Sequence, residues 1–351
     1  MADNKMTAVI LKNFQKQLAK NKIDGYIVTD YMDQRYLCGF HLYAAEAAYL
    51  ITPQKVFAFT RDLYITQLRA SYAFMNAAAS INFAADAARK AKELKLKKVC
   101  FDAEKTSYLD GKIFDAAGFK PSAFTPGKMR EVKTEEEIKI LSQSCRIAYK
   151  TFEHLKKFLK TGMTETEVAN EIAWHMQSLG ADSGGAYNIV AFGVNSNNTH
   201  HVSGDTKLKD ETPVLFDFSF VYKGYYSDIT RSWWHGKNPS AEYKKVWQIV
   251  NAARAAGVKA AKPGITGKDL DLVARKIITD AGYGKYFIHR LGHGIGMDVH
   301  EVPCAQATNT EKLAQNNVIS VEPGIYLPGK FGIRLEDTVV VNKTGGIILT
   351  K

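Results

Sequence analysis

The sequence has few cysteines, no long apolar run and no block of like charge, and each absence excludes a class of protein. Its four cysteines lie far apart and form no Cys-x-x-Cys pair, so we expect neither a disulfide framework nor a thiolate zinc site. No run of about eighteen apolar residues is present, and the first residues lack the apolar region of a signal peptide. These absences predict no membrane partner, reduced thiols and a cytoplasmic location.

Charge and size narrow the possibilities further. The net charge of +11 comes from 47 Lys and Arg against 36 Asp and Glu, and the lysines are scattered, which argues against a nucleic-acid partner. A chain of 351 residues with 46% hydrophobic residues can bury a substantial core and favours two domains. A turn at Phe124–Gly127 suggests the boundary, which gives domains 1–125 and 126–351.

The first domain alternates between helical and strand-like sequence. We expect helices at 8–20 and 81–94, and strands at 26–29, 47–52, 56–60 and 98–101. This pattern predicts a compact α/β layer. Nothing in it gathers carboxylates, histidines or a phosphate-binding glycine loop, so a scaffolding or gating role is favoured over a catalytic one.

The second domain contains an internal repeat. A capping box at Thr164 opens a predicted helix that ends at Gly180, and the same pattern of cap, length and terminator returns from Thr266 to Gly282. Each copy leads into strand-rich sequence. The repeat predicts an α+β domain with two similar halves related by a pseudo-twofold axis, and a cleft between such halves is a natural ligand site.

The first half places two acidic residues in a predicted hairpin. Strands at 214–220 and 225–230 flank the two-residue turn Lys223-Gly224, so that 217 pairs with 230 and 219 pairs with 228. Asp217 and Asp228 would then be diagonal neighbours on one face. Two buried carboxylates this close are unfavourable unless a proton or a cation lies between them.

The second half offers a matching pair and a histidine. Glu322 and Glu336 each lie within one of two apolar strands expected at 318–324 and 332–340. Between the two acidic pairs in sequence, the stretch 289–303 carries His293 among glycines that allow a close backbone approach. Four carboxylates and one imidazole suit two divalent cations, with Mn²⁺ the first expectation and Co²⁺, Fe²⁺ or Zn²⁺ as alternatives.

These motifs resemble the five-ligand signature of the pita-bread metallopeptidases, peptidase family M24. The matching residues are Asp217, Asp228 eleven positions later, His293 in Gly-His-Gly, Glu322 in Glu-Pro-Gly and Glu336 in Gly-Ile-Arg-Leu-Glu-Asp. The resemblance implies that Asp217 binds one metal, that His293 and Glu322 bind the other, and that Asp228 and Glu336 bridge them. It also implies a bridging hydroxide as the nucleophile, with Glu322 able to move the proton.

The segment His300-Glu301-Val302-Pro303 and the amino-terminal domain resemble the Xaa-Pro dipeptidases (prolidases) and the aminopeptidases P. This likeness implies a creatinase-like first domain, and it implies that His200 and His300 hold the substrate and stabilise the oxyanion. Arg334 and His289 would orient carboxylates and substrate. His201, adjacent to His200, is the alternative active-site histidine.

The resemblance implies metal-dependent hydrolysis of an Xaa-Pro bond in dipeptides or short peptides by a homodimer. Two alternatives use the same fold. One is a creatinase-type C–N hydrolase that works without a metal, and the other is a non-catalytic module that binds peptides. Relatives of the first kind lose metal ligands, whereas this chain keeps all five.

Overall fold

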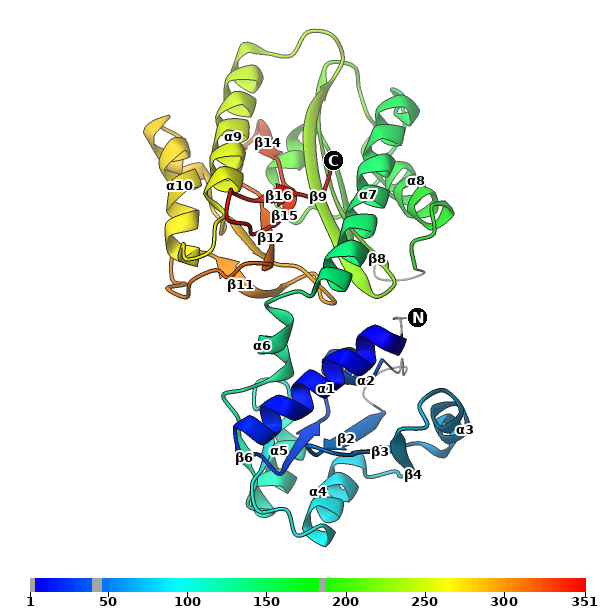
Figure 1. Ribbon diagram of the computed structural model, residues 1–351. Coiled ribbons are helices and arrows are strands. Elements are labelled where there is room, and N and C mark those ends of the chain that lie inside the picture. Colours follow the sequence, from blue (N-terminus) through cyan, green and yellow to red (C-terminus); the bar gives the residue numbers. More distant parts are fainter. Residues whose placement is uncertain (1–3, 40–45, 183–186) are drawn as a thin grey trace. The chain divides into compact units, whose positions relative to one another are not determined.

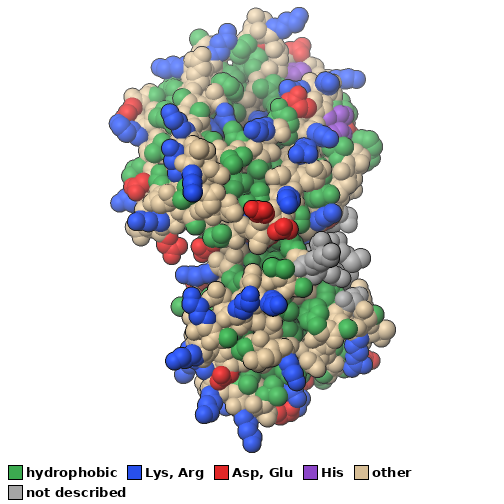
Figure 2. Space-filling model, viewed as in Figure 1, with side chains coloured by type: hydrophobic (Ala, Val, Ile, Leu, Met, Phe, Trp, Pro, Cys, Tyr) green, Lys and Arg blue, Asp and Glu red, His purple; other side chains and the backbone are tan. Residues whose placement is uncertain are grey.

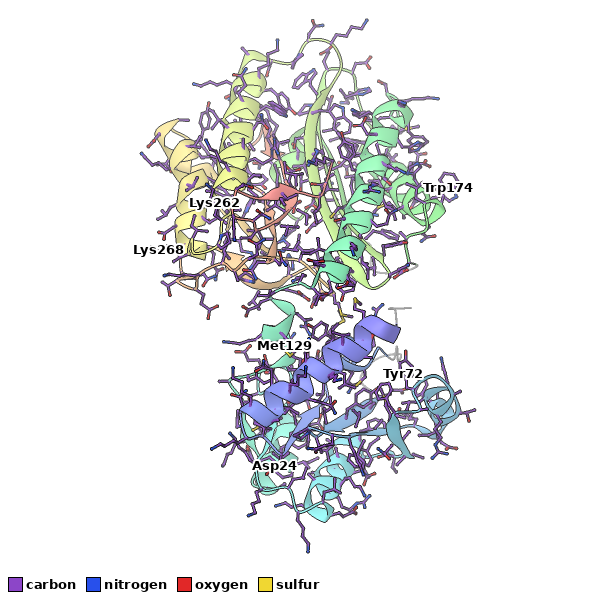
Figure 3. All side chains as sticks on the ribbon, viewed as in Figure 1. Asp24, Tyr72, Met129, Trp174, Lys262 and Lys268 are labelled. Atoms are coloured by element: carbon purple, nitrogen blue, oxygen red, sulfur yellow. The ribbon has the colours of Figure 1, made fainter. Side chains whose placement is uncertain are left out.

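A computed structural model describes residues 4–39, 46–182 and 187–351, which form two compact units, Met1–Met129 and Arg130–Lys351 (Figure 1). The division falls in the short helix α6 (Pro126–Arg130), which carries Met129 (Figure 3). No helix in these described stretches is long and apolar enough to cross a membrane. Lys and Arg side chains are scattered over the surface seen in Figure 2.

The first unit contains a six-stranded sheet in the order β4-β3-β2-β1-β5-β6. Its strands are β1 (Gly25–Val28), β2 (Ala47–Ile51), β3 (Val56–Thr60), β4 (Met75–Ala79), β5 (Val99–Phe101) and β6 (Lys120–Pro121). Its helices are α1 (Asn4–Lys20), α2 (Tyr31–Cys38), α3 (Asp62–Ser71), α4 (Phe83–Glu93) and α5 (Tyr108–Ala116). Buried alanines on α4 pack against Ile27, Leu50 and Phe101 of the sheet. The predicted α/β layer is therefore confirmed.

The first half of the second unit is built on a three-stranded antiparallel sheet, β7 (Tyr187–Phe192), β8 (Thr212–Tyr222) and β9 (Tyr225–His235). Two helices, α7 (Glu135–Phe158) and α8 (Glu165–Ser178), pack against it. Ile147 of α7 and Ile172 of α8 are buried with Phe216 and Phe218 of β8. The apolar residues that recur at helical spacing in α7 and α8 therefore pack in one core with those of β8.

The second half has a related plan of two helices, α9 (Ala241–Ala260) and α10 (Gly267–Asp280), over short strands. One sheet has the order β11 (Glu301–Ala305), β10 (Gly292–Gly294), β12 (Val318–Val321), β15 (Asp337–Val340) and β16 (Ile347–Ile348). A second sheet contains β13 (Gly324–Leu327) and β14 (Phe331–Arg334). The 3₁₀ segments η1 (Gly193–Asn197) and η2 (Gly284–Tyr286) lie in the connections.

The predicted repeat is visible in the backbone. Helices α8 and α10 both have 14 residues, and the Thr164 and Thr266 side chains cap them by accepting from the third helical amide. Both threonines also form an isolated β-bridge, to Lys207 and Lys312 respectively. In each half, therefore, a threonine caps the start of the second helix and a glycine follows its end.

The predicted strand pair 318–324 with 332–340 is wrong in one respect, because it is interrupted. β12 pairs with β15, and β13 pairs with β14 in a separate sheet. The amide of Glu322 donates to Leu291 O at 2.8 Å and the amide of Glu336 donates to Thr230 O at 3.1 Å, so neither is available to a continuous ladder. Pro323 has no N–H to donate. The two glutamates therefore lie at the interruption and not within strands.

Candidate active site

The hairpin of the first half has the predicted register. Asp217 pairs with Thr230 and Ser219 with Asp228, and the turn residues Lys223 and Gly224 both have positive φ, as a two-residue hairpin turn requires. Asp217 and Asp228 therefore share one face of the hairpin. Both line a cavity of about 860 Å³ in the second unit.

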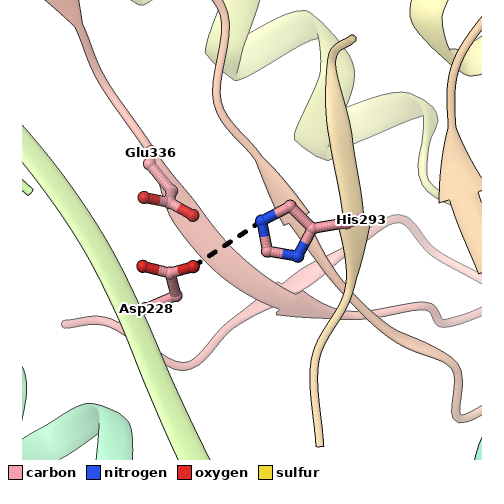
Figure 4. Close-up of side chains that lie close together, drawn as sticks. All are labelled: Asp228, His293 and Glu336. Atoms are coloured by element: carbon pink, nitrogen blue, oxygen red, sulfur yellow. Dashed lines mark ion pairs between the residues drawn. The ribbon is translucent and has the colours of Figure 1, made fainter. Parts of the chain in front are cut away.

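The other three predicted metal ligands line the same cavity. His293 comes from the short strand β10, while Glu322 and Glu336 come from the two chain segments at the sheet interruption. His293 Nε2 lies 3.1 Å from Glu322 Oε1 and 3.6 Å from Asp228 Oδ2. In Figure 4 the side chains of Asp228, His293 and Glu336 point toward one another, and one ligand atom from each lies within 4.8 Å of the others.

The electrostatics of this cluster are those of a cation site. Burial raises the pKa of Asp228 well above its usual range, and the charge of Asp217 raises it further. Burial also raises the pKa of Glu336, with the charge of Asp228 acting in the same direction. Glu322 differs: the hydrogen bond and charge of His293 outweigh burial and hold its pKa at about 2. A divalent cation bound at the cluster would lower the pKa values of Asp228 and Glu336 and allow both carboxyls to ionise.

The donor atoms of the cluster suit a metal, and one buried atom supports this. Glu336 Oε2 accepts a hydrogen bond from Thr230 Oγ1 at 2.8 Å, whereas Glu336 Oε1 is buried with no partner among the described residues. An unpaired buried carboxylate oxygen is costly unless a cation or proton binds it. Together with three further carboxylates and an imidazole, it provides the oxygen-rich donor set that Mn²⁺ and similar ions favour.

Several side chains hold the predicted metal ligands in place. Arg334, on β14, is buried and donates to Asp217 Oδ2, to Tyr326 Oη at 2.6 Å and to Thr230 Oγ1 at 3.2 Å. His289 Nε2 lies 2.9 Å from the same Tyr326 Oη. Ser320 Oγ donates to Glu322 Oε1 at 3.0 Å and accepts from the amide of His293 at 3.0 Å.

Thr230, Ser320 and Tyr326 were not predicted from the sequence. A signal for two of them was present, because Thr230 stands two residues after Asp228 and Ser320 stands two residues before Glu322. Residues two apart in an extended strand share a face, so in the strands expected from the sequence these polar side chains lie on the same face as the predicted ligands. Tyr326 gave no comparable signal, since its contacts to His289 and Arg334 depend on the separate β13–β14 pair.

The neighbouring histidines His200 and His201 have different surroundings. His200 lines the cavity. His201 Nε2 instead lies 2.7 Å from Glu165 Oε2, a carboxylate with no exposed side-chain surface. His300 lines the cavity too, and its ring packs edge-on against His293 with centroids 4.3 Å apart. Burial, reinforced by the charge of His293, lowers the pKa of His300, which favours a neutral imidazole.

Two similar halves around a cavity lined by four carboxylates and a histidine define the catalytic domain of a metal-dependent peptidase. Residues 139–343 match the family described as "Metallopeptidase family M24", and residues 10–132 match the "Creatinase/Prolidase N-terminal domain". The chain belongs to metallopeptidase family M24. The resemblance drawn from the five ligand motifs is thereby confirmed at the level of family, fold and peptidase class.

Known proteins resemble the chain over nearly its whole length. The "Uncharacterized peptidase YqhT" of Bacillus subtilis (strain 168) is 37% identical over 97% of this chain and 96% of its own. A solved structure named Xaa-Pro dipeptidase from Bacillus anthracis is 33% identical, with a TM-score of 0.90 and 98% of both chains covered. The X-Pro aminopeptidase from Thermotoga maritima MSB8 is 34% identical, with a TM-score of 0.88 and 97% of both chains covered.

Proposed function

We propose that the protein hydrolyses the Xaa-Pro bond of dipeptides or short peptides with the aid of two divalent metal ions, Mn²⁺ being the first candidate. The observation that carries this proposal is the convergence of four carboxylates and His293 on one cavity. The likeness to structures named Xaa-Pro dipeptidase and X-Pro aminopeptidase supports the choice of substrate. Both names specify cleavage at an Xaa-Pro bond. They differ in the substrate, which is a dipeptide for the first and the amino-terminal end of a peptide for the second.

The ligand set divides between two metal positions. Asp217 would hold one metal, and His293 with Glu322 would hold the other. Asp228 and Glu336, whose carboxyl pKa values burial raises most strongly in the absence of a cation, would contact both. When bound, such metals polarise the scissile carbonyl and lower the pKa of a water molecule that attacks it.

The protein's own groups would handle the proton and the substrate. Glu322 is ionised, because the hydrogen bond and charge of His293 outweigh burial and lower its pKa. As the family resemblance implies, it would take a proton from the attacking water and deliver it to the leaving proline nitrogen. His200 and His300 would hold the carbonyl oxygen as it becomes an oxyanion. Arg334 fixes the orientation of Asp217, and His289 steadies Tyr326, which contacts Arg334.

A cytoplasmic location and a homodimeric assembly are parts of the same proposal. Both come from the sequence and from the family resemblance, and neither is needed for the cavity described above, which is lined by residues of the second unit alone. Light scattering of the purified protein would measure the mass. A mass of one chain across a concentration series would contradict the dimer.

A paired peptide assay tests the proposed activity. Ala-Pro and Ala-Pro-Ala are incubated with the protein and Mn²⁺ or Co²⁺, with and without a chelator, and Ala-Ala serves as a control without proline. Cleavage of Ala-Pro that the chelator abolishes is expected, with much less cleavage of Ala-Ala. If neither proline peptide is cleaved in a chelator-sensitive manner, the proposal is wrong.

A further inference from the structure

Three loops of the first unit meet at one end of its six-stranded sheet. They join α1 to β1, β2 to β3 and α4 to β5, and they comprise residues 21–24, 52–55 and 94–98. Asp24, labelled in Figure 3, accepts through Oδ2 from the amides of Lys97 at 3.0 Å and Lys98 at 2.8 Å, so the first and third loops are in contact. Residues of all three loops line a cavity of about 580 Å³. This volume lies within the range typical of small-molecule sites.

The charges around this cavity are mostly positive. Three of its lining side chains are the exposed lysines Lys55, Lys95 and Lys97. Within the described stretches of the chain, none of the three forms an ion pair. Among the lining residues that the structure describes, Asp24 carries the only carboxylate, and its Oδ2 is already bound to two backbone amides. The lining therefore has an excess of positive charge.

The backbone at Lys95 is strained for a residue that has a side chain. Helices α5, α8 and α10 end in the same hydrogen-bonded turn, and the residue with positive φ in that turn is a glycine, namely Gly118, Gly180 and Gly282. In the corresponding turn after α4, Lys95 has a φ of 54°, and after α1 Lys22 has a φ of 53°. Glycine would adopt this left-handed conformation without strain. A lysine at position 95 therefore has a cost in the fold, which favours a function for its charge.

We propose that this cavity binds the polyphosphate group of a small-molecule anion through Lys55, Lys95 and Lys97. One exposed ammonium group attracts a single negative charge only weakly in water, but several around one cavity act together on an anion with several charges. Lysine binds phosphate as a point charge, so no glycine-rich loop is needed. The apolar side chains of Phe57 and Leu96 line the same cavity and would suit the base of a nucleotide.

This site is independent of the proposed peptidase activity, because every residue of its lining belongs to the first unit. The alternative role for Lys95 is local, since a positive charge near the carboxyl end of α4 offsets the negative end of the helix dipole. The variant Lys95→Gly separates the two roles. Removing the charge weakens anion binding only if Lys95 contacts the ligand, whereas the strain is relieved in either case.

Calorimetric titration of the 351-residue chain tests the proposal, with a chelator present so that phosphate groups cannot bind through a metal. The probes are ATP, inorganic tripolyphosphate and adenosine. We expect saturable binding of ATP and tripolyphosphate that weakens at high salt, and no binding of adenosine. Tighter binding of ATP than of tripolyphosphate would assign the site to a nucleotide, and equal affinity would assign it to a simple polyphosphate. If neither ATP nor tripolyphosphate binds, or if adenosine binds as well as ATP, the proposal is wrong.

Variants with matched losses of charge locate the binding. The double variant Lys55→Gln with Lys97→Gln should weaken ATP binding about tenfold or more, since two ammonium groups are lost. The control is Lys12→Gln with Lys112→Gln, which removes the same charge from exposed lysines of the first unit outside the lining and should change the affinity little. Lys95→Gly should weaken ATP binding while raising Tm. Equal weakening in the control, or unchanged ATP affinity in Lys95→Gly, would overturn the proposal.

Discussion

Lys133 Nζ lies 3.0 Å from Glu301 Oε2, and the two side chains have exposed fractions of 0% and 3%. Arg130 Nε donates to the other carboxylate oxygen of Glu301 at 3.1 Å. Glu301 directly follows His300 and begins β11. Buried ion pairs thereby connect the first residues of the second unit to Glu301, the neighbour of a histidine of the proposed active site.

Replacing Lys133 with Met should destabilise the second unit severely. The change leaves the Glu301 carboxylate buried with one fewer cation, and removing one partner of a buried pair costs about 3–5 kcal/mol. Lys330→Met is the matched control, because Lys330 pairs with Glu242 at the surface, where the side chains are 56% and 42% exposed. That change should leave the free energy of unfolding almost unchanged, because water and salt screen an exposed ion pair. Denaturant unfolding measures both, and similar losses would contradict a special role for the buried pair.

Asp228→Asn should have opposite effects on stability and on metal binding. Burial raises the pKa of Asp228 in the folded, metal-free protein, so that protein holds the proton more strongly than the unfolded chain. Protonated Asp228 therefore stabilises the folded metal-free protein. This stabilisation is complete below the carboxyl pKa of the unfolded chain, about 4, and is lost as the pH rises through the higher pKa of the folded protein. Asn mimics the protonated form and should therefore stabilise chelator-treated protein near pH 7 while having little effect near pH 4.

Thermal unfolding in chelator at both pH values measures this difference. A rise in Tm of about 3 °C or more near pH 7 would correspond to roughly 1 kcal/mol in a domain of this size. In the presence of Mn²⁺ the wild type should have the higher Tm. Asp228→Asn should then bind less metal, measured by elemental analysis, and have lower activity. An unchanged metal content would reject the bridging role. Asp205→Asn, at an exposed acid outside the cavity lining, is the control.

The sequence predicted those parts of the site that depend on local rules. The register that brings Asp217 and Asp228 to one face follows from the turn Lys223-Gly224, which lies between them. The interruption at Glu322 could not be predicted in this way. It depends on a hydrogen bond from the Glu322 amide to Leu291 O, a partner about thirty residues away that only the folded chain brings close.

The distinction between His200 and His201 was also beyond the sequence. Both stand in one polar segment, and strand alternation cannot be applied in an irregular connection. What separates them is Glu165, a buried carboxylate at the start of α8 that accepts from His201 and from the amide of Phe192. Burial of an acid at a helix start is set by tertiary packing, which no local pattern encodes.

The two histidines should therefore respond differently to substitution. His200→Ala should lower kcat about 100-fold or more by removing a group that holds the oxyanion, with little change in Tm. His201→Ala should lower Tm, because the buried Glu165 carboxylate loses its His201 partner and keeps only, among the described residues, the amides of Phe192 and Gly204 and the side chain of Asn195, at a cost of about 1–3 kcal/mol. His201→Gln keeps a donor and should recover part of that loss. A large fall in kcat for His201→Ala at unchanged Tm would reverse the assignment.

The glycine before the proposed metal ligand His293 should be intolerant of a side chain. A Cβ at Gly292 would lie 2.0 Å from Ser320 O, a backbone atom of the neighbouring strand β12 that cannot move without displacing Ser320 Oγ, which binds the His293 amide. Gly292→Ala should therefore cost about 1–3 kcal/mol and weaken metal binding. In Gly204→Ala the new methyl group meets nothing within 4 Å, so stability and metal content should both remain close to those of the wild type. Equal metal affinity in the two variants would show that the close contact between β10 and β12 does not position His293.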